Sequence, residues 1–471
     1  MDVDVAVLGG GPGGYPAAIR AAQLGLRVAV VEQGRLGGTC LNVGCIPTKA
    51  WVQSAHAMKD AHTSFAKLGV TIPEATLDFD AVQRNKSEIV DRTVGGVTGL
   101  LKANGIAVVE GRGRFTDANT IAVDGGETVR FAHAVIATGS RPVRPPVEGI
   151  DGPRCVDSTG LLEITEPPKR LIVLGGGVIG VEFASIFHHF GAEVTIVEML
   201  PHLIPMEDAD AVKELERAFT KGGIRLQLGA RAQRVDDGDG DLVLHITDAK
   251  GQEQQVAGDL LLVATGRRAN VEDLGLEAAG VQAEPARIPT DARRRTNVPH
   301  IYAVGDVAGY WQLAHTAFRE GEIAADNIAG HDVAMGGAVP RCIYTDPEIA
   351  AVGLTEAEAR ERYGDDRIRV GRFPFSAIAR AAMFADRTGF VKTIHETELD
   401  ELLGVVVVGP SATELINAAV VAIDAEARID TVGDAIAAHP TLAEALKEAA
   451  LMGLDRPLHW PPAKKKAPAA A

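Results

Sequence analysis

A glycine-rich turn occurs twice in this chain, each time between a short apolar run and a segment with helical periodicity. In the first copy residues 3–8 (VDVAVL) lead into GGGPGG at 9–14, and in the second residues 170–174 (RLIVL) lead into GGGVIG at 175–180. In both copies a glutamate, Glu32 or Glu198, follows the first glycine by 23 positions and closes a second apolar run. A repeat with identical spacing is hard to obtain by chance, and this strand–turn–helix–strand unit is typical of dinucleotide binding. The sequence therefore predicts an α/β fold with two Rossmann-like dinucleotide sites.

The residue types in each turn fit this purpose. Without side chains, Gly9, Gly11 and Gly14 let the backbone approach a pyrophosphate at the helix N-terminus, where unpaired N–H groups and the helix dipole favour anions. Glu32 then lies where its carboxylate accepts hydrogen bonds from a ribose. In the second copy Glu198 would bind the 2′-hydroxyl of NAD and repel the 2′-phosphate of NADP. The residues that follow, MLPHLIPMED, contain no arginine to bind that phosphate, so we expect NAD; a solvated glutamate at a strand end is the alternative.

Two cysteines, Cys40 and Cys45, lie close behind the first turn in the stretch LGGTCLNVGCIPTK. A regular helix separates residues five apart by about 7.5 Å along its axis, more than the roughly 4.4–6.8 Å between the Cα atoms of a disulfide. A bond between the two sulfurs therefore requires a distorted backbone, which the neighbouring glycines make easy. Two ordinary buried cysteines are the alternative, since unpaired cysteine is among the most buried residue types. The neighbouring nucleotide turn favours a redox-active disulfide that faces a bound cofactor.

Composition and charge narrow the class of protein. A chain of 471 residues is long enough for roughly three domains, and 46% hydrophobic residues with 52 glycines are typical of a globular α/β protein. A net charge of −16 argues against binding to a nucleic-acid backbone. The four cysteines do not form the pattern of a secreted disulfide framework, and we expect neither a signal peptide nor a membrane span. These features predict a cytoplasmic protein.

Three further apolar runs are expected to end near the nucleotide sites. Residues 134–141 (AVIATGSR) and 260–267 (LLLVATGR) end in Thr-Gly turns, and residues 301–309 (IYAVGDVAG) end in a Gly-Asp pair before a helix at 314–329. Ligands of an open α/β sheet bind beyond the carboxyl ends of its strands, so Asp306 is a candidate for binding a cofactor sugar. An ordinary turn is the alternative for this Gly-Asp pair.

From residue 339 onward strands mix with helices and no nucleotide turn occurs, which predicts an α+β domain. We expect strands at 349–353, 367–373, 389–394 and 402–408, and helices at 412–427, 431–436 and 442–451. The last helix follows the segment HPTLAE, in which His439 has the pKa range for proton transfer and Glu444 could fix its tautomer. Alternatively, Thr441 and Glu444 form a capping box that starts this helix. Glu444 is not expected to serve both purposes fully at once.

Taken together, LGGTCLNVGCIPTK, the doubled glycine turn, IYAVGDVAG and HPTLAE resemble the flavoprotein disulfide reductases, and the similarity covers residues 3–455. The resemblance implies FAD in the first site, NAD in the second, and a C-terminal domain that forms a homodimer. The domain ranges it implies are 1–143 and 270–338 for the two parts of the FAD-binding domain, 144–269 for the NAD-binding domain and 339–460 for the dimerisation domain. Residues 461–471, which end in the low-complexity stretch AKKKAPAAA, are expected to form a disordered tail.

The resemblance also implies roles for single residues. Cys40 would exchange with the substrate, Cys45 would lie beside the flavin, and His439 of the partner subunit would be the acid–base group, oriented by Glu444. Glu182 would pair with Lys49 near the flavin N5, where a positive charge stabilises the reduced flavin. The other FAD-binding positions are Gly9, Gly11, Gly14, Glu32, Gly38, Thr39, Gly113, Gly139, Ser140, Asp306 and Ala314. The NAD-binding positions are Gly175, Gly177, Val178, Ile179, Gly180, Glu198, Ala232, Gly266 and Arg267, and no metal ligands are expected.

The substrate follows from finer features of the resemblance. Residues 11–15 (GPGGY), residues 313–315 (LAH) and the Thr-Leu pair at 441–442 resemble lipoamide enzymes more than glutathione or trypanothione reductases. Position 178 is valine where glutathione reductases have tyrosine, and no cysteine follows Cys342, whereas mercuric reductases end in a cysteine pair. This implies FAD-dependent oxidation of protein-bound dihydrolipoamide with reduction of NAD. The implied partners are the lipoyl domains and acyltransferase core of 2-oxoacid dehydrogenase complexes, or a glycine-cleavage complex.

Two alternatives to this function stay open. The chain could be another NAD(P)H-linked disulfide or quinone reductase of the same family, distinguished by its electron acceptor. It could instead be a non-enzymatic, NAD-responsive binding subunit that keeps only the fold. Intact Cys40, Cys45, His439 and Glu444 argue against the second alternative.

Overall fold

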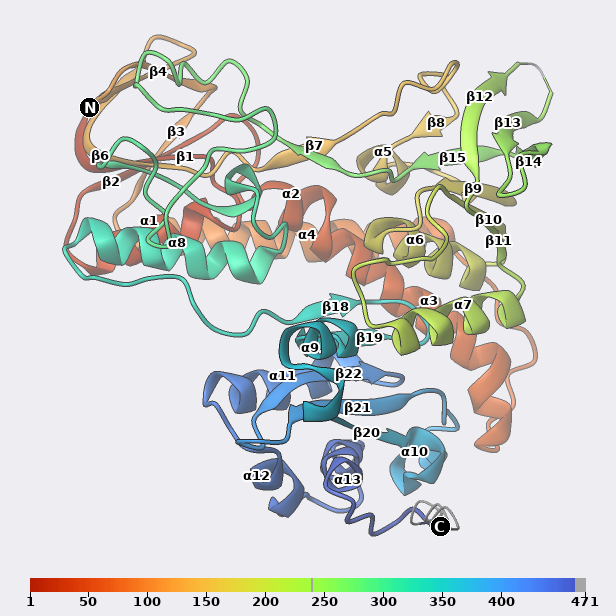
Figure 1. Ribbon diagram of the computed structural model, residues 1–471. Helices are drawn as coiled ribbons and strands as arrows, with labels where there is room; N and C mark the ends of the chain where they lie inside the picture. Colours follow the sequence, from red (N-terminus) through yellow and green to blue (C-terminus); the bar gives the residue numbers. More distant parts are fainter. Residues whose placement is uncertain (239, 462–471) are drawn as a thin grey trace. The chain divides into compact units, whose positions relative to one another are not determined.

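The computed structural model describes residues 1–238 and 240–461 (Figure 1). The chain forms two compact units: Met1–Trp51, Asp78–Pro167 and Leu262–Gly336 make up the first, and Val52–Leu77, Pro168–Leu261 and Gly337–Ala471 make up the second. Of the expected tail, residues 462–471 lie outside the described residues. The predicted domain ranges divide the chain more finely than these two units and stay a prediction.

A mixed sheet forms the centre of the first unit, in the order β3-β2-β1-β6-β5-β4, with β17 also paired to β6. Strands β1, β2, β3, β6 and β17 run parallel, and β5 and β4 continue the sheet antiparallel. The strands of this unit are β1 (Asp2–Leu8), β2 (Val28–Glu32), β3 (Ala107–Glu110), β4 (Gly113–Asp117), β5 (Thr120–Val123), β6 (Thr128–Ile136), β7 (Ser140–Pro142), β8 (Cys155–Val156), β16 (Arg267–Ala269) and β17 (Ile301–Ala303). Its helices are α1 (Gly14–Gln23), α2 (Gly38–Val43), α4 (Phe79–Ala103), α5 (Ser158–Leu162), the 3-10 helix η1 (Gly305–Ala308) and α8 (Ala314–Ile328).

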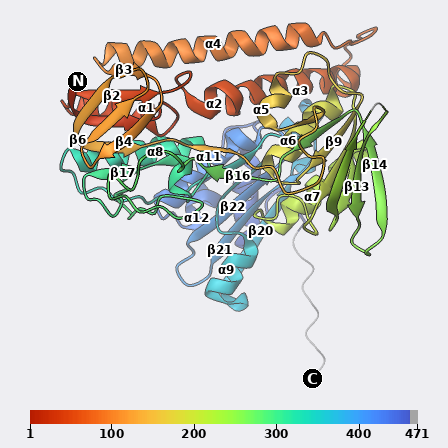
Figure 2. The ribbon, with the colours of Figure 1, turned by 90° about the horizontal axis from the view of Figure 1, so that it is seen from above.

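Successive residues of the central strands enter two different cores, because side chains alternate between the faces of a sheet. Val5 and Val7 of β1 pack with residues of α1, α4 and α8. Ala6 and Leu8 face the opposite core, which β4, β5 and the segment around residues 269–288 complete. Helices α1 and α8 lie side by side (Figure 1), and α4 runs past α2 and β3 (Figure 2). Burial on both faces explains why the sequence of β1 reads as a continuous apolar run.

The second unit repeats the parallel arrangement in a sheet with the order β11-β10-β9-β15. Its elements are β9 (Arg170–Leu174), α6 (Val178–His189), β10 (Glu193–Glu198), α7 (Ala209–Gly222), β11 (Arg225–Leu228) and β15 (Leu260–Val263). A three-stranded antiparallel sheet of β12 (Arg231–Asp237), β13 (Leu242–Thr247) and β14 (Glu253–Gly258) follows β11 in sequence. Helix α3 (Cys45–Lys67) begins in the first unit and continues in the second.

The C-terminal part of the second unit is an antiparallel sheet in the order β18-β19-β22-β21-β20. Its core joins the sheet to α11, α12 and α13, and every residue of β21 and β22 is buried. The elements are β18 (Arg341–Ile343), β19 (Ile349–Gly353), α9 (Glu356–Tyr363), η2 (Asp365–Arg367), β20 (Ile368–Pro374), η3 (Phe375–Ala377), α10 (Ala379–Met383), β21 (Phe390–Glu396), β22 (Leu402–Val408), α11 (Ala412–Asp424), α12 (Ile429–Asp434) and α13 (Glu444–Gly453).

The predicted fold class, two Rossmann-like units followed by an α+β domain, is confirmed. The runs at 134–141 and 260–267 end as strands at Ile136 and Val263, just before their Thr-Gly turns, as predicted. Other element boundaries were wrong. The run at 301–309 is a strand only to Ala303 and then a 3-10 helix. The last helix begins at Glu444 rather than at residue 442.

Candidate active site

The first glycine turn brings the end of β1 into close contact with the start of α1. Gly9 has a left-handed backbone with φ of 107°, and a Cβ on Gly14 would lie 1.8 Å from the Gly9 carbonyl oxygen. Gly11 has more room, since the nearest heavy atom to a Cβ there would be the Gly38 Cα at 3.6 Å. No side chain caps the N-terminus of α1. The N–H groups of Gly14 and Tyr15 donate to the Gly11 carbonyl oxygen at 2.9 and 3.0 Å and close the turn, so it is the positive end of the helix dipole that favours an anion at the mouth of the turn.

The second turn has the same construction. Gly175 has a φ of 113°, and a Cβ on Gly180 would lie 2.0 Å from the Gly175 carbonyl oxygen. A Cβ on Gly177, the N-cap of α6, would meet no atom within 4 Å. Val178 and Ile179 form the first turn of α6, as predicted for residues beside a bound nucleotide.

The two glutamates at the strand ends have matching contacts. The Glu32 carboxylate accepts hydrogen bonds from the backbone N–H of Gly10 at 2.7 Å and of Gly34 at 2.8 Å. The Glu198 carboxylate accepts hydrogen bonds from the N–H of Gly176 at 2.5 Å and of Leu200 at 2.7 Å. Each carboxylate is thereby fixed beside its glycine turn, where a ribose would reach it. Tight glycine contacts, open space before the helix and a fixed carboxylate fit a dinucleotide in both units.

The two cysteines lie on either side of a break between helices. Helix α2 ends at Val43, and α3 begins at Cys45. Gly44 leaves the helical conformation, with φ of −140° and ψ of −111°, and a Cβ there would lie 2.9 Å from the Thr39 carbonyl oxygen. The predicted distortion between Cys40 and Cys45 is therefore present at Gly44.

Sequence analysis missed Asn42, which lies between the cysteines. Its side-chain Nδ2 donates hydrogen bonds to the carbonyl oxygens of Leu36 at 3.0 Å and of Gly38 at 2.9 Å. These bonds hold the loop that enters α2, where Gly37 and Gly38 both have positive φ. An amide between two cysteines of a glycine-rich stretch was the available signal.

The two cysteines titrate as an interacting pair. The hydrogen bond with Cys45 raises the pKa of the Cys40 thiol, burial and a negative charge on Cys45 raise it further, and the positive charge of Lys49 lowers it. The pair therefore loses its two protons in separate steps. Burial lowers the pKa of the Arg267 guanidinium, and the electrostatic effects of Asp306 and Cys45 oppose this shift.

Asp306 lies within a buried polar cluster of the first unit. The Ser140 hydroxyl donates a hydrogen bond to the Asp306 carboxylate and accepts one from Arg267 Nε at 2.8 Å. Arg267 Nη2 also donates to the Ser140 carbonyl oxygen at 2.8 Å. The prediction had placed Ser140 and Asp306 with FAD but Arg267 with NAD. Arg267 therefore contacts two of the predicted FAD positions, and its binding to NAD stays a prediction.

A second residue that sequence analysis missed supports the Asp306 loop. Glu320 of α8 is only 1% exposed, and its carboxylate accepts a hydrogen bond from the Gly305 N–H at 2.6 Å. Arg294 Nη1 lies 3.3 Å from the other Glu320 oxygen. Burial raises the pKa of Glu320, and the charge of Arg294 opposes that shift. A glutamate inside an apolar helix face was the available signal.

The remaining predicted cofactor positions are distributed as follows. Gly113 begins β4, and a Cβ there would lie 2.7 Å from Leu8 Cδ1, so a larger residue would make the neighbouring core side chains shift. Glu182 is buried in α6 and accepts a hydrogen bond from the Tyr344 N–H at 2.9 Å. Other positions are Thr39 in α2, Lys49 in α3, Ala232 in β12, Ala314 at the start of α8, and Gly139 and Gly266 in turns with positive φ. The predicted pairing of Glu182 with Lys49 stays a prediction.

His439 and Glu444 are in contact. His439 Nδ1 lies 2.8 Å from Glu444 Oε1, and Glu444 Oε2 accepts a hydrogen bond from the Thr441 N–H at 2.8 Å. Each carboxylate oxygen has its own donor, so Glu444 contacts both residues, but it does not serve both expected purposes in full. The capping box is not formed, since the Thr441 hydroxyl donates to the Ala438 carbonyl oxygen. Burial raises the pKa of Glu444, but the bonds from His439 and Thr441 outweigh it and hold the pKa below its ordinary value.

A carboxylate only accepts hydrogen bonds, so this contact requires a proton on His439 Nδ1. Nε2 is then the nitrogen that can take a proton from a substrate. The His439 side chain is 73% exposed, which leaves that nitrogen accessible. The pair in this unit has the geometry of a histidine base with an orienting carboxylate.

One turn further along α13, a second pair has similar geometry. Glu448 is buried, and its carboxylate lies 2.8 Å from His459 Nδ1. Trp460 then packs edge-on against Phe373 of β20, with ring centroids 6.1 Å apart. Sequence analysis missed this pair, because the two residues are separated by eleven positions and form no motif.

The two cysteines and the predicted FAD-binding positions apart from Glu182 lie in the first unit. The second glycine turn, Glu198 and the His439–Glu444 pair lie in the second unit. None of the helices among residues 1–238 and 240–461 is both long and apolar enough to cross a membrane. In the same part of the chain, no three His, Cys, Asp or Glu side chains are grouped closely enough to hold a metal ion.

Comparison with known families places these features in context. Residues 3–321 match the family model of the pyridine nucleotide-disulphide oxidoreductases. Residues 339–450 match the dimerisation domain of the same family.

Three similar proteins are named dihydrolipoyl dehydrogenases. A dihydrolipoyl dehydrogenase of Bacillus subtilis is 41% identical over 462 residues, which cover 97% of this chain and 99% of that protein. A dihydrolipoyl dehydrogenase of Thermus scotoductus is 43% identical over 454 residues, covering 95% of this chain and 96% of the relative. The mitochondrial dihydrolipoyl dehydrogenase 1 of Arabidopsis thaliana is 40% identical over 464 residues, which cover 97% of this chain and 91% of that protein.

Two solved structures superpose on nearly the whole chain. The HOCl-induced flavoprotein disulfide reductase RclA of Escherichia coli superposes with a TM-score of 0.85 at 31% identity, over 94% of this chain and 98% of RclA. LpdA of Mycobacterium tuberculosis superposes with a TM-score of 0.87 at 30% identity, over 95% of this chain and 99% of LpdA.

Proposed function

Because this chain belongs to the pyridine nucleotide-disulphide oxidoreductase family, we propose that it oxidises protein-bound dihydrolipoamide to lipoamide and reduces NAD. The observation that carries the proposal is its identity of about 40% to dihydrolipoyl dehydrogenases along nearly their whole length. The enzyme is a homodimeric oxidoreductase that uses FAD and NAD.

Each cofactor has a defined set of candidate residues. FAD would bind the first turn (Gly9, Gly11 and Gly14) and Glu32, with Ser140, Arg267 and Asp306 holding its central part. NAD would bind the second turn from Gly175 to Gly180 and Glu198. Bound FAD supplies the acceptor that takes two electrons from the dithiol and passes them to NAD as hydride.

The dithiol chemistry is assigned to four side chains. His439 of the partner subunit takes a proton from one thiol of dihydrolipoamide at Nε2, because the thiolate is the nucleophile. That thiolate attacks Cys40 Sγ of the oxidised pair, the Cys40–Cys45 bond breaks, and Cys45 leaves as a thiolate. The second substrate thiol loses its proton and attacks the substrate sulfur bound to Cys40. Lipoamide leaves with its new disulfide, and the enzyme retains the two electrons as a Cys40–Cys45 dithiol.

A thiolate on one sulfur of the reduced pair raises the pKa of the other thiol, so the pair carries one negative charge before it carries two. We assign that charge to Cys45, the sulfur beside the flavin. Glu444 accepts a hydrogen bond from Nδ1 of His439 and so leaves Nε2 as the nitrogen that receives the substrate proton. The domain ranges 1–143, 144–269, 270–338 and 339–460 belong to this proposal.

The proposed partners are lipoyl domains attached to the acyltransferase core of 2-oxoacid dehydrogenase complexes, or those of a glycine-cleavage complex. A lipoyl group on a mobile domain suits an exposed histidine such as His439. A cytoplasmic location is part of the proposal and rests on the cysteine pattern of the sequence.

A second candidate function is that of a disulfide or quinone reductase with another acceptor. The similarity to RclA, a flavoprotein disulfide reductase, favours it. Both functions use the Cys40–Cys45 pair, so the acceptor distinguishes them.

The test of the proposal compares two reactions of the purified, FAD-loaded enzyme. We expect rapid NAD reduction by dihydrolipoamide and little NADPH-dependent reduction of glutathione disulfide. His439→Ala should remove most lipoamide turnover but leave NADH oxidation by an artificial electron acceptor, which needs no thiol proton transfer. Equal loss of both activities would contradict the role of His439, and absence of lipoamide turnover in the parent enzyme would contradict the proposed substrate.

A further inference from the structure

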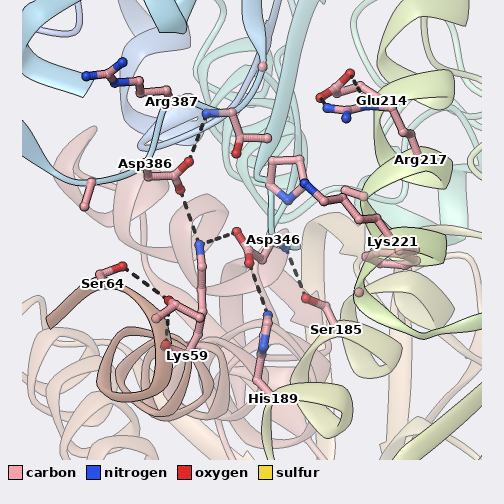
Figure 3. A pocket seen from close by; sticks show the side chains of 18 of the residues that line it. Lys59, Ser64, Ser185, His189, Glu214, Arg217, Lys221, Asp346, Asp386 and Arg387 are labelled. Atoms are coloured by element: carbon pink, nitrogen blue, oxygen red, sulfur yellow. Dashed lines mark hydrogen bonds and ion pairs between the residues drawn. The ribbon is translucent and has the colours of Figure 1, made fainter. Parts of the chain in front are cut away.

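A large cavity lies within the second unit, apart from the glycine turns and from the His439–Glu444 pair (Figure 3). Its volume is about 1010 Å³, and side chains from α3, α6, α7, β20 and the segment after α10 line it. Its basic side chains are Lys59, Lys67, His188, His189, Arg217, Lys221, Arg372 and Arg387, and its carboxylates are Glu214, Asp346 and Asp386.

The carboxylates of this cavity are already neutralised by neighbours. Lys59 Nζ lies 2.7 Å from Asp346 and 3.3 Å from Asp386, and His189 Nε2 lies 3.3 Å from the other oxygen of Asp346 (Figure 3). Glu214 is paired with Arg217. These contacts hold the pKa of Asp346 well below its usual range, against the opposing effect of burial. The acidic side chains of the cavity are therefore already paired with basic side chains that line it.

Several basic side chains of this cavity have no such ion-pair partner among the described residues. Within the part of the chain that the structure describes, Lys67, Lys221 and Arg387 make no side-chain hydrogen bond or ion pair. The half-buried His188 ring only stacks on His189, with centroids 5.3 Å apart, and neither of its nitrogens has a hydrogen-bond partner there. Three cationic side chains and one imidazole therefore line the same cavity, in a chain whose net charge is −16.

We propose that this cavity binds a small molecule with two or more phosphate groups. A concave site of one charge sign concentrates ions of the opposite sign, and it does so most clearly against an acidic background. Lysine, arginine and imidazole groups are the side chains that bind phosphate oxygens. The volume is that of a site for a ligand of nucleotide size, whereas a single phosphate would leave most of it empty.

The ends of three helices suggest a competing explanation for these charges. α3 ends at Lys67, α6 at His189 and α7 at Gly222, and each has a basic residue in its last turn. Cations there stabilise the negative end of a helix dipole without any ligand. If that were their only purpose, replacing them would lower stability and leave anion binding unchanged.

The test is calorimetric titration of the FAD-loaded homodimer with tripolyphosphate and, separately, with ATP, at saturating NAD so that the nucleotide turn is filled. The variant K67Q/K221Q removes two cations of the cavity. The matched control K213Q removes an exposed lysine of the same helix α7 that does not line the cavity. Basal turnover should be unchanged in both variants.

We expect saturable binding of tripolyphosphate that weakens with added salt, at least about tenfold weaker binding by K67Q/K221Q and less than about twofold change in K213Q. ATP binding more tightly than tripolyphosphate would identify a nucleotide as the ligand, and equal binding would identify the phosphate chain as sufficient. Equal affinity of the parent enzyme and K67Q/K221Q would overturn the proposal, as would the absence of saturable binding.

Discussion

Replacement of Glu444 by glutamine tests how the candidate base is oriented. In the structure the two carboxylate oxygens serve different groups, His439 Nδ1 and the Thr441 N–H, each at 2.8 Å. Glutamine has an NH₂ group in place of one oxygen, so it can accept from only one of these groups and faces the other with a donor. Glu444→Gln therefore removes one charge-assisted hydrogen bond while the side chain keeps its size.

The expected magnitude follows from the exposure of the pair. A hydrogen bond to a charged group contributes about 1.5–3 kcal/mol, and the low end applies because the His439 side chain is 73% exposed. About 1.5 kcal/mol corresponds to roughly a tenfold loss of lipoamide turnover. The pKa of Glu444 is lowered by its partners, so the stabilisation it provides is present above the unfolded pKa of a glutamate and is lost as pH falls through the lower folded value.

The assay is steady-state reduction of NAD by dihydrolipoamide across pH, in the parent enzyme and in a His439→Gln background. If Glu444 acts through His439, Glu444→Gln costs about tenfold alone and almost nothing in the His439→Gln background. Glu448→Gln is the matched control, because Glu448 makes the same 2.8 Å contact with His459 on the same helix. Equal losses in both backgrounds, or an equal loss in Glu448→Gln, would refute the orienting role.

Three further changes give distinct outcomes. Lys392 is 2% exposed, lies 2.9 Å from Asp208 and pairs with two more carboxylates. Lys392→Met should therefore lower the free energy of unfolding by about 3–5 kcal/mol in denaturant titrations, because it leaves the buried carboxylate of Asp208 without its cation. A loss below about 1 kcal/mol would contradict a buried charge cluster. Gly44→Ala should slow reduction of the Cys40–Cys45 disulfide by dihydrolipoamide, because the new Cβ would approach the Thr39 carbonyl oxygen to 2.9 Å, whereas Gly95→Ala, with open space around it, should leave that rate unchanged. Glu198→Gln should reduce the preference for NAD over NADP roughly tenfold in kcat/KM, and an unchanged ratio would count against ribose binding by Glu198.

The doubled turn could be predicted from sequence because its requirements are local. A glycine where φ is positive and a glutamate at a fixed distance are properties of one βαβ unit, and β1 and β9 are buried on both faces and therefore read as apolar runs. A distorted backbone between Cys40 and Cys45 was predicted for the same reason, since a regular helix cannot hold a disulfide at that spacing, and the structure places the distortion at Gly44. The helix start at Glu444 was placed two residues early, because the capping pattern does not say which donor a carboxylate will choose.

Contacts between distant segments escaped prediction. Arg267 lies 127 positions from Ser140 and 39 from Asp306, and only the folded chain shows that it belongs to their cluster. The same holds for Glu320 under the Asp306 loop and for His459 beside Glu448. None of these residues has a local spacing that distinguishes it from an ordinary surface or core residue.

The sequence by itself determined the fold class, the two nucleotide turns, the cysteine pair and the histidine–glutamate segment, because each depends on backbone geometry or charge over a few residues. Only the tertiary structure decided that Glu444 serves His439 and Thr441 with separate oxygens, and that basic side chains of α3, α6, α7 and the segment after α10 line one cavity. Hydrogen bonds, burial and Coulomb interactions depend on distances through space, and the order of residues along the chain does not fix those distances.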